Sequence, residues 1–146
     1  MVLKLYGLAG ATAAGRVRVV LEELNVPYEF VVVSLPGASH CTAPPPSDSP
    51  THEHHDTAPV HPFGQLPYID DDGLVLFESR AICRYLALKH GGVGTLIPDT
   101  ADLVATARFE QAASVELCNF EPYASGLAHE NIFKRRAPRR VMLRSG

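Results

Sequence analysis

The amino-acid sequence predicts an α/β domain followed by the start of an all-helical domain. Residues 2–33 show the pattern strand, helix, strand, and residues 66–90 show the pattern strand, turn, strand, helix. Residues 102–133 carry a helical pattern with no strand pattern among them. We therefore expect an α/β domain over residues 1–90 and part of a helical domain over residues 99–133.

The composition is that of a globular protein, and 146 residues leave room for one domain and a fragment of a second. A formal net charge of −3 gives no reason to expect a nucleic-acid partner or a membrane surface. No apolar run is long enough to span a bilayer, and no leader pattern opens the chain. The three cysteines are odd in number and far apart in the sequence, which fits free thiols in a reducing compartment. We expect a cytoplasmic protein.

The first three elements follow from hydrophobic periodicity. Val2–Tyr6 alternates as a strand does, and Tyr28–Val33 is a second β-like run, so apolar that we expect it to be covered on both faces. Between them, apolar residues recur at helical spacing, at Val17, Val20, Leu21 and Leu24. Two strands joined by a helix form a βαβ unit, so these two strands are expected to be parallel.

Residues 61–82 are the stretch around which the chain is organised. Leu66–Pro67 opens a short apolar run, and because only X–Pro bonds make the cis form cheap, a cis peptide is expected here. Asp71–Gly73 supplies turn residues, Leu74–Phe77 is a second short strand, and a helix begins at Ser79.

Glu78 and Ser79 stand where this helix starts. The N-terminus of a helix favours an anion, so Ser79 and its backbone N–H suit a carboxylate. The Glu78 carboxylate suits an ammonium group. The alternative is an ordinary helix cap, with both residues present for local reasons.

Residues 62–67 (Pro-Phe-Gly-Gln-Leu-Pro) and 77–82 (Phe-Glu-Ser-Arg-Ala-Ile) together resemble the glutathione transferases, and the phi class of plants and fungi most of all. The resemblance implies a thioredoxin-like fold with a cis peptide at Leu66–Pro67, whose backbone pairs with the cysteinyl part of glutathione. It also implies that Glu78 and Ser79 hold the γ-glutamyl end. The glutathione-binding residues carried over in this way are Ala11, His40, Gln65, Leu66, Pro67, Glu78 and Ser79.

The turn before the first helix departs from the family pattern. Aligned on Arg16-Val17, Ala11 occupies the place of the serine that in the family donates a hydrogen bond to the glutathione sulfur. Thr12 is the nearest hydroxyl and is the candidate catalytic residue. It is equally open that Thr12 is only a helix N-cap.

Residues 36–61 are rich in Pro, Ser, Thr and His and predict a disordered insert. Only His40 matches the family's contacts to the glycyl end of glutathione, because the family's lysine is absent. The tract at residues 51–56 contains three histidines and two carboxylates, but a solvated loop is favoured over a metal site. We expect no metal.

Beyond an N-cap at 99–102, the helical pattern continues to Phe133 and is interrupted only by Pro122. In the family this helix opens a longer domain, so the chain resembles a truncated member. Residues 134–146 read as a basic tail. The abrupt change of composition at the insert and at the tail favours an imperfect gene model or a splice variant.

The resemblance implies a detoxification enzyme that conjugates the glutathione thiolate to a small electrophilic molecule. Glutathione would be a co-substrate, with no other cofactor, and a complete helical domain would imply a homodimer. The alternative is a non-catalytic glutathione-binding or interaction module, which the alanine at position 11 favours.

Overall fold

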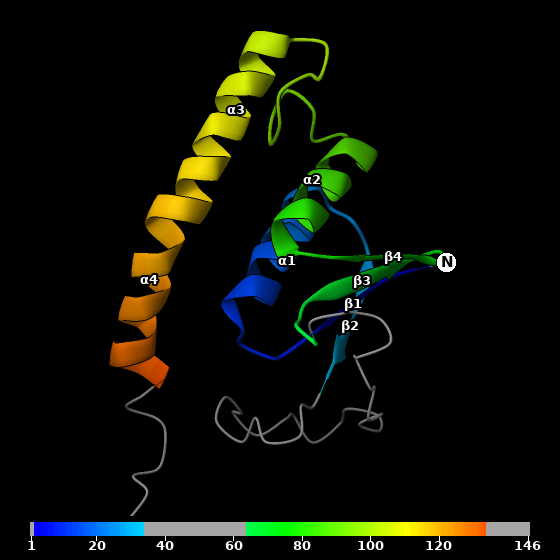
Figure 1. Cartoon of the computed structure of the whole chain (residues 1–146). Coiled ribbons are helices and arrows are strands. Elements are labelled where there is room, and N and C mark those ends of the chain that lie inside the picture. The colour runs from blue at the N-terminus through cyan, green and yellow to red at the C-terminus, as the bar shows by residue number, and fades with distance from the viewer. Residues whose placement is uncertain (1, 34–63, 134–146) are drawn as a thin grey trace, which may run out of the picture. The chain divides into compact units, whose positions relative to one another are not determined.

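The computed structural model describes residues 2–33 and 64–133 (Figure 1). The predictions for residues 36–61 and 134–146 lie outside the described residues. The chain divides into two compact units, Met1–Leu103 and Val104–Gly146. Among the described residues, no helix combines the length and the apolar composition that crossing a bilayer requires.

The first unit is built on a mixed sheet of four strands in the order β2-β1-β3-β4. These strands are β1 (Leu3–Gly7), β2 (Tyr28–Val32), β3 (Tyr68–Asp71) and β4 (Leu74–Phe77). β1 pairs with β2 in parallel, as the βαβ pattern predicted, whereas β3 is antiparallel to both β1 and β4. This arrangement confirms the predicted thioredoxin-like fold.

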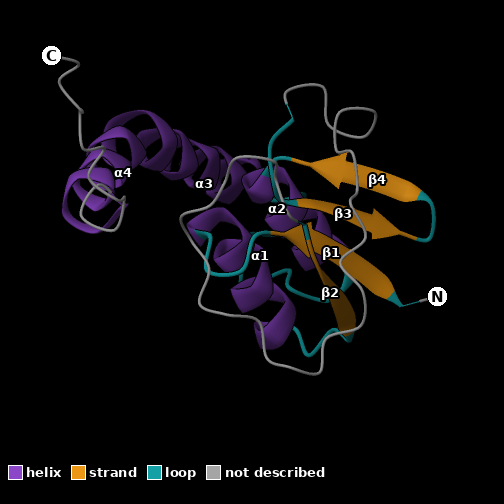
Figure 2. Ribbon diagram, turned by 90° about the horizontal axis from the view of Figure 1, so that it is seen from below, coloured by secondary structure: helices purple, strands orange, loops and turns teal. Residues whose placement is uncertain are grey.

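Two helices, α1 (Thr12–Glu23) and α2 (Ser79–Lys89), cover one face of the sheet, as Figure 2 shows. Their apolar stripes and the strand residues beneath them form one core, whose fully buried members are Leu5, Val17, Leu21, Ile69, Ile82 and Leu86. Helix α2 ends at Lys89, and Gly91, which follows the C-cap residue His90, has a φ of 81°, a left-handed conformation that glycine adopts without a steric penalty.

A second cluster lies on the opposite face, because successive side chains of a strand point to opposite sides of the sheet. Its centre is the stacked pair Tyr6 and Tyr68, whose ring centroids are 4.4 Å apart. Burial, followed by the proximity of Tyr6 and Asp70, raises the pKa of Tyr68 to about 12. This phenol therefore stays neutral at physiological pH.

The expectation that the second strand, Tyr28–Val33, is covered on both faces holds only in part. Tyr28 and Phe30 pack against the first cluster and Val31 against the second, and Val33 is buried, but none of the five residues of β2 is buried and Val32 is 41% exposed. β2 lies at the edge of the sheet. Local composition indicates a strand but does not specify its place in the sheet, which depends on how β3 pairs with β1.

The second unit is helical throughout its described length. It comprises α3 (Leu103–Val115), the π-helical segment η1 (Glu116–Phe120), α4 (Glu121–Ala128) and the π-helical segment η2 (His129–Phe133). Pro122 lies in the first turn of α4, directly after η1, where the wider turn accommodates a residue without an N–H donor. No residue of α3, η1 or α4 is buried, and Phe120 is 63% exposed.

A hydrogen-bonded group of three side chains ties the β3–β4 hairpin to the end of α2. Asp71 Oδ2 accepts hydrogen bonds from Lys89 Nζ at 2.5 Å and from Tyr85 Oη at 2.7 Å. Burial opposes ionisation of Asp71, but the two hydrogen bonds outweigh it, and the pKa of this carboxyl falls below its usual value of 3.8. An acid with a lowered pKa stabilises the fold above its unfolded-state pKa and loses that contribution as the pH falls through its folded-state pKa.

We predict that Asp71→Asn destabilises the protein at pH 6 and that the difference from wild type shrinks as the pH falls below 3.8. The asparagine can still accept a hydrogen bond but cannot pair with the Lys89 charge. Urea unfolding at a series of pH values measures this. Asp72→Asn, at the exposed neighbouring turn position, is the matched control and should show no such convergence. A constant difference between the Asp71 variant and wild type across the pH range would contradict the assignment.

Candidate functional site

The register of the sheet brings three loops to one edge, formed by the C-terminal ends of β1 and β4 and the N-terminal end of β3. Tyr6 at the end of β1 pairs with Tyr68 at the start of β3, which in turn pairs with Phe77 at the end of β4. The turn that follows β1, the peptide that precedes β3 and the residues that follow β4 therefore lie next to one another. These are the segments in which the sequence placed the site.

The Leu66–Pro67 peptide bond is cis, as predicted. Pro67 is buried directly before the first residue of β3, where its missing N–H costs no hydrogen bond of the ladder. Leu66 packs against the second cluster, while Gln65 is exposed. The burial of Pro67 and the packing of Leu66 thus hold this backbone in place, while Gln65 next to it is accessible to solvent.

Glu78 has a backbone conformation that L-residues rarely adopt, with φ 70° and ψ 103°. It occupies the N-cap position of α2, yet its side chain makes no capping hydrogen bond. Among the described residues its exposed carboxylate has no hydrogen bond or ion pair. An ordinary helix cap therefore does not account for Glu78. A strained backbone that carries an unpaired carboxylate makes Glu78 a candidate functional residue.

Ser79 is the first residue of α2, and only 7% of its surface is exposed. Its Oγ accepts a hydrogen bond of 2.8 Å from Arg16 Nη1, a residue of α1 that lies 63 positions away in the sequence. Sequence reasoning did not assign Arg16 to the site and used it only to align the turn. No local signal marks this contact, because it exists only once α1 and α2 have packed together.

Positive charge gathers around the start of α2. The Cys83 thiol lies one turn after Ser79 and contacts the Arg16 carbonyl oxygen, with 3.8 Å between Sγ and O. Burial raises the pKa of Cys83 above its usual 9.0, although the charges of Arg16, Arg84 and Arg80 act to lower it. Three guanidinium groups are thus close enough to influence one thiol, at a helix N-terminus whose dipole favours an anion.

The start of α1 lies at the same edge. Ala11 is its N-cap residue, with no side chain able to cap, so the interpretation of Thr12 as the N-cap is wrong. The first intrahelical bond runs from the Gly15 N–H to the Ala11 carbonyl at 2.9 Å. The N–H groups of residues 12–14 therefore lack helical partners, and the Thr12 side chain beside them is exposed. A hollow of about 210 Å³ adjoins this turn.

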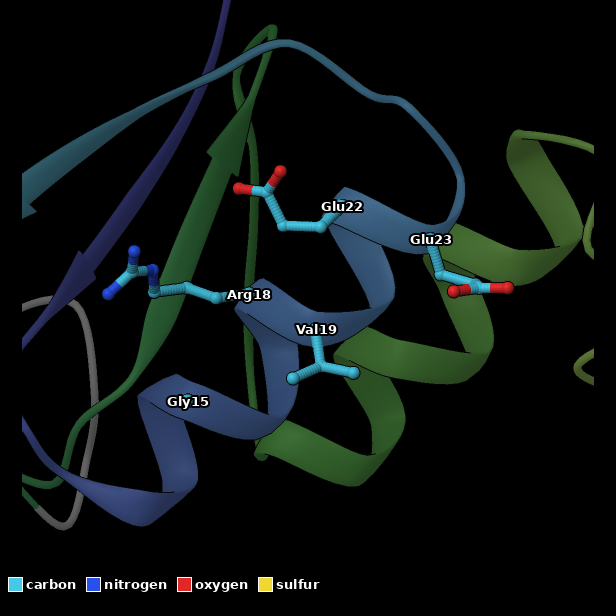
Figure 3. Close-up of a pocket in the computed structure, with 5 residues that line it drawn as sticks. All are labelled: Gly15, Arg18, Val19, Glu22 and Glu23. Carbon is cyan, nitrogen blue, oxygen red and sulfur yellow. The ribbon is translucent and has the colours of Figure 1, made fainter.

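A larger hollow of about 480 Å³ lies on the solvent side of α1 and contains none of the predicted site residues (Figure 3). Its basic side chain, Arg18, is held by the Tyr28 hydroxyl at 3.1 Å and lies over the Phe30 ring. Residues two apart on a helix point in nearly opposite directions, so Arg18 lies away from the Ser79 side that Arg16 contacts. We do not assign the site here.

The described residues contain no group of three or more histidine, cysteine, aspartate or glutamate side chains arranged to hold a metal ion. The histidine-rich tract at residues 51–56 and the predicted ligand His40 lie outside the described part of the chain, so both predictions stay untested.

A mixed sheet of this order, with a cis-proline at the edge where two helices begin, defines a thioredoxin-like domain. Residues 1–88 match the family model "Glutathione S-transferase, N-terminal domain". The chain belongs to the glutathione S-transferase family, and its curated relatives include phi-type proteins of plants and fungi.

Two curated relatives are each 41% identical to this chain. One is glutathione S-transferase hmp2 of Hypomyces subiculosus, aligned over 135 residues, which are 92% of this chain and 57% of the relative. The other is glutathione S-transferase PM239X14 of Arabidopsis thaliana, aligned over 90% of this chain and 56% of the relative.

A maize structure, glutathione S-transferase I in complex with an atrazine glutathione conjugate, is 28% identical with a TM-score of 0.70. The alignment covers 90% of this chain and 55% of the maize chain. This chain thus spans about half the length of the relatives that it matches.

We predict that iodoacetamide alkylates Cys118 faster than Cys83 in the folded chain. Cys118 is exposed, whereas Cys83 is partly buried and its raised pKa leaves little thiolate at pH 7.5. Peptide mass spectrometry after timed quenching measures both rates. In denaturant the two rates should become similar, and equal rates in the native chain would show that the burial of Cys83 is wrong.

Proposed function

We propose that this chain binds glutathione at the edge formed by Pro67, Glu78, Ser79 and the start of α1, and that it belongs to a transferase conjugating the glutathione thiolate to electrophilic carbon. The convergence of these segments, fixed by the pairing of β1, β3 and β4, is the observation that supports the proposal. The maize relative bound to a glutathione conjugate supports it as well.

The charges at the start of α2 match the γ-glutamyl group of glutathione. Its carboxylate would accept hydrogen bonds from Ser79 and from the backbone at this helix N-terminus. Its ammonium group would pair with the Glu78 carboxylate. The cysteinyl backbone would pair with the chain beside Pro67, and Gln65 lies exposed next to that position.

The chemical step needs a thiolate. The glutathione thiol loses its proton to solvent, the sulfur attacks the electrophilic carbon, and the leaving group departs with its electron pair as the C–S bond forms. Ala11 cannot donate a hydrogen bond through its side chain. The N–H groups of residues 12–14 and the Thr12 hydroxyl are the donors that this chain offers to the sulfur.

The relatives also support broader expectations for the whole protein. We propose a cytoplasmic detoxification enzyme that takes a small electrophilic molecule, forms a homodimer where the helical domain is complete, and needs no cofactor beyond its co-substrate glutathione. Because Ala11 removes the side-chain donor, a glutathione-binding module without turnover is the second candidate. Retention on immobilised glutathione, combined with a conjugation assay, separates the two.

We predict that Glu78→Gln and Ser79→Ala each weaken glutathione binding by ~1.5–3 kcal/mol, the range for a hydrogen bond to a charged group. That range corresponds to roughly a 10- to 150-fold rise in Kd. Isothermal titration calorimetry on the folded variants measures it. Glu23→Gln, which removes an exposed carboxylate of α1, is the control. Unchanged affinity in both site variants would rule out this glutathione site.

We predict that Ala11→Ser lowers the pKa of bound glutathione and raises the conjugation rate, because it adds a donor beside the sulfur. Thr12→Val should act in the opposite direction. Thiolate absorbance of the complex, titrated against pH, measures the pKa without requiring turnover. If neither variant moves the titration, this turn takes no part in activating the sulfur.

A further inference from the structure

The contact between Arg16 and Ser79 constrains which way the serine hydroxyl can act. A serine hydroxyl has one hydrogen to donate and lone pairs to accept with, whereas a guanidinium group only donates. In the bond of 2.8 Å between Arg16 Nη1 and Ser79 Oγ, the arginine is therefore the donor and the serine the acceptor. The serine hydrogen remains for another group.

Among the described residues, no acceptor takes this hydrogen, although Ser79 is only 7% exposed. A buried donor without an acceptor is costly, and native structures usually provide a partner. Ser79 is the first residue of a helix of eleven residues, and the residue before it, Glu78, has an exposed carboxylate that is unpaired among the described residues. This is where the proposed function places the γ-glutamyl carboxylate.

The positive charge of Arg16 reinforces this polarity. A hydroxyl that accepts a hydrogen bond from a cation becomes a stronger donor, because linked hydrogen bonds polarise one another. The backbone carbonyl oxygen of Arg16 also contacts Cys83 Sγ on α2. Arg16 thus links the helix that begins at the sulfur end of the site to the helix that begins at the γ-glutamyl end.

Resting on the proposed function, we propose that Arg16 is the positioning residue of the γ-glutamyl subsite. By donating to Ser79 Oγ, it fixes this hydroxyl as a donor, so that the subsite selects a carboxylate over a neutral amide.

The test compares two ligands, glutathione and an analogue in which the α-carboxylate of the γ-glutamyl residue is a carboxamide. The measured quantity is the ratio of their Kd values for the 146-residue chain. A merely structural role for Arg16 would weaken both ligands alike and leave the ratio unchanged. We expect Arg16→Gln to reduce the preference for glutathione about tenfold, as the loss of one charge-assisted hydrogen bond implies.

Arg16→Lys, which keeps the charge and donor hydrogens, should restore part of the preference. Lys4→Gln removes an exposed cation near the start of β1, at the end of this strand away from the site, and should leave the ratio as in wild type. In a double variant with Ser79→Ala, the arginine change should have no further effect, because Arg16 acts through Ser79.

A wild-type ratio in Arg16→Gln, or effects of the two substitutions that multiply, would overturn the inference. If Arg16→Gln does not fold, Arg16→Lys decides. The role is contradicted if Arg16→Lys leaves the Kd ratio as in wild type and Ser79→Ala changes that ratio equally in the Arg16→Lys and wild-type backgrounds. These outcomes differ from failure of the proposed function, in which Glu78→Gln and Ser79→Ala themselves leave glutathione affinity unchanged.

Discussion

The structure of the first unit depends on the packing of α1 and α2 against one face of the sheet. Its central side chains are wholly excluded from solvent. They are Leu5 and Ile69 from the strands, Val17 and Leu21 from α1, and Ile82 and Leu86 from α2. Each buried aliphatic side chain contributes about 1.5–3 kcal/mol relative to an exposed one. Because β1 and β4 run in the same direction and each leads into a helix, this packing fixes both helix N-termini at one edge. The polar chemistry of that edge follows from an apolar interface below it.

Much of this arrangement could be predicted from local pattern. The strand Leu74–Phe77, the turn before it and the cis peptide at Pro67 agree with the sequence prediction, because spacing, turn residues and proline each act over a few positions. The edge position of β2 could not be predicted, since it depends on which strands pair. The contact between Arg16 and Ser79 could not be predicted either, because it joins two helices through their packing and leaves no periodic signal.

The helices of the two units differ in how much of their surface is buried by tertiary packing. In α1 and α2 an apolar stripe is buried, whereas α3 and α4 contain no buried residue and expose apolar side chains such as Phe120 and Leu127. Their backbone hydrogen bonds are local, and tertiary packing normally supplies most of the stability of a helix. The part of the chain that matches the family model is therefore also the part with the larger buried core.

The positive φ of Glu78 ties thermal robustness and ligand recognition to one residue. Glycine would occupy this backbone conformation without the strain, which costs on the order of 1–3 kcal/mol, although its greater freedom in the unfolded chain offsets part of that gain. It would also delete the carboxylate to which the proposed function assigns the γ-glutamyl ammonium group. Under that proposal, the strain at Glu78 is stability given up in order to place a charged group at the binding site.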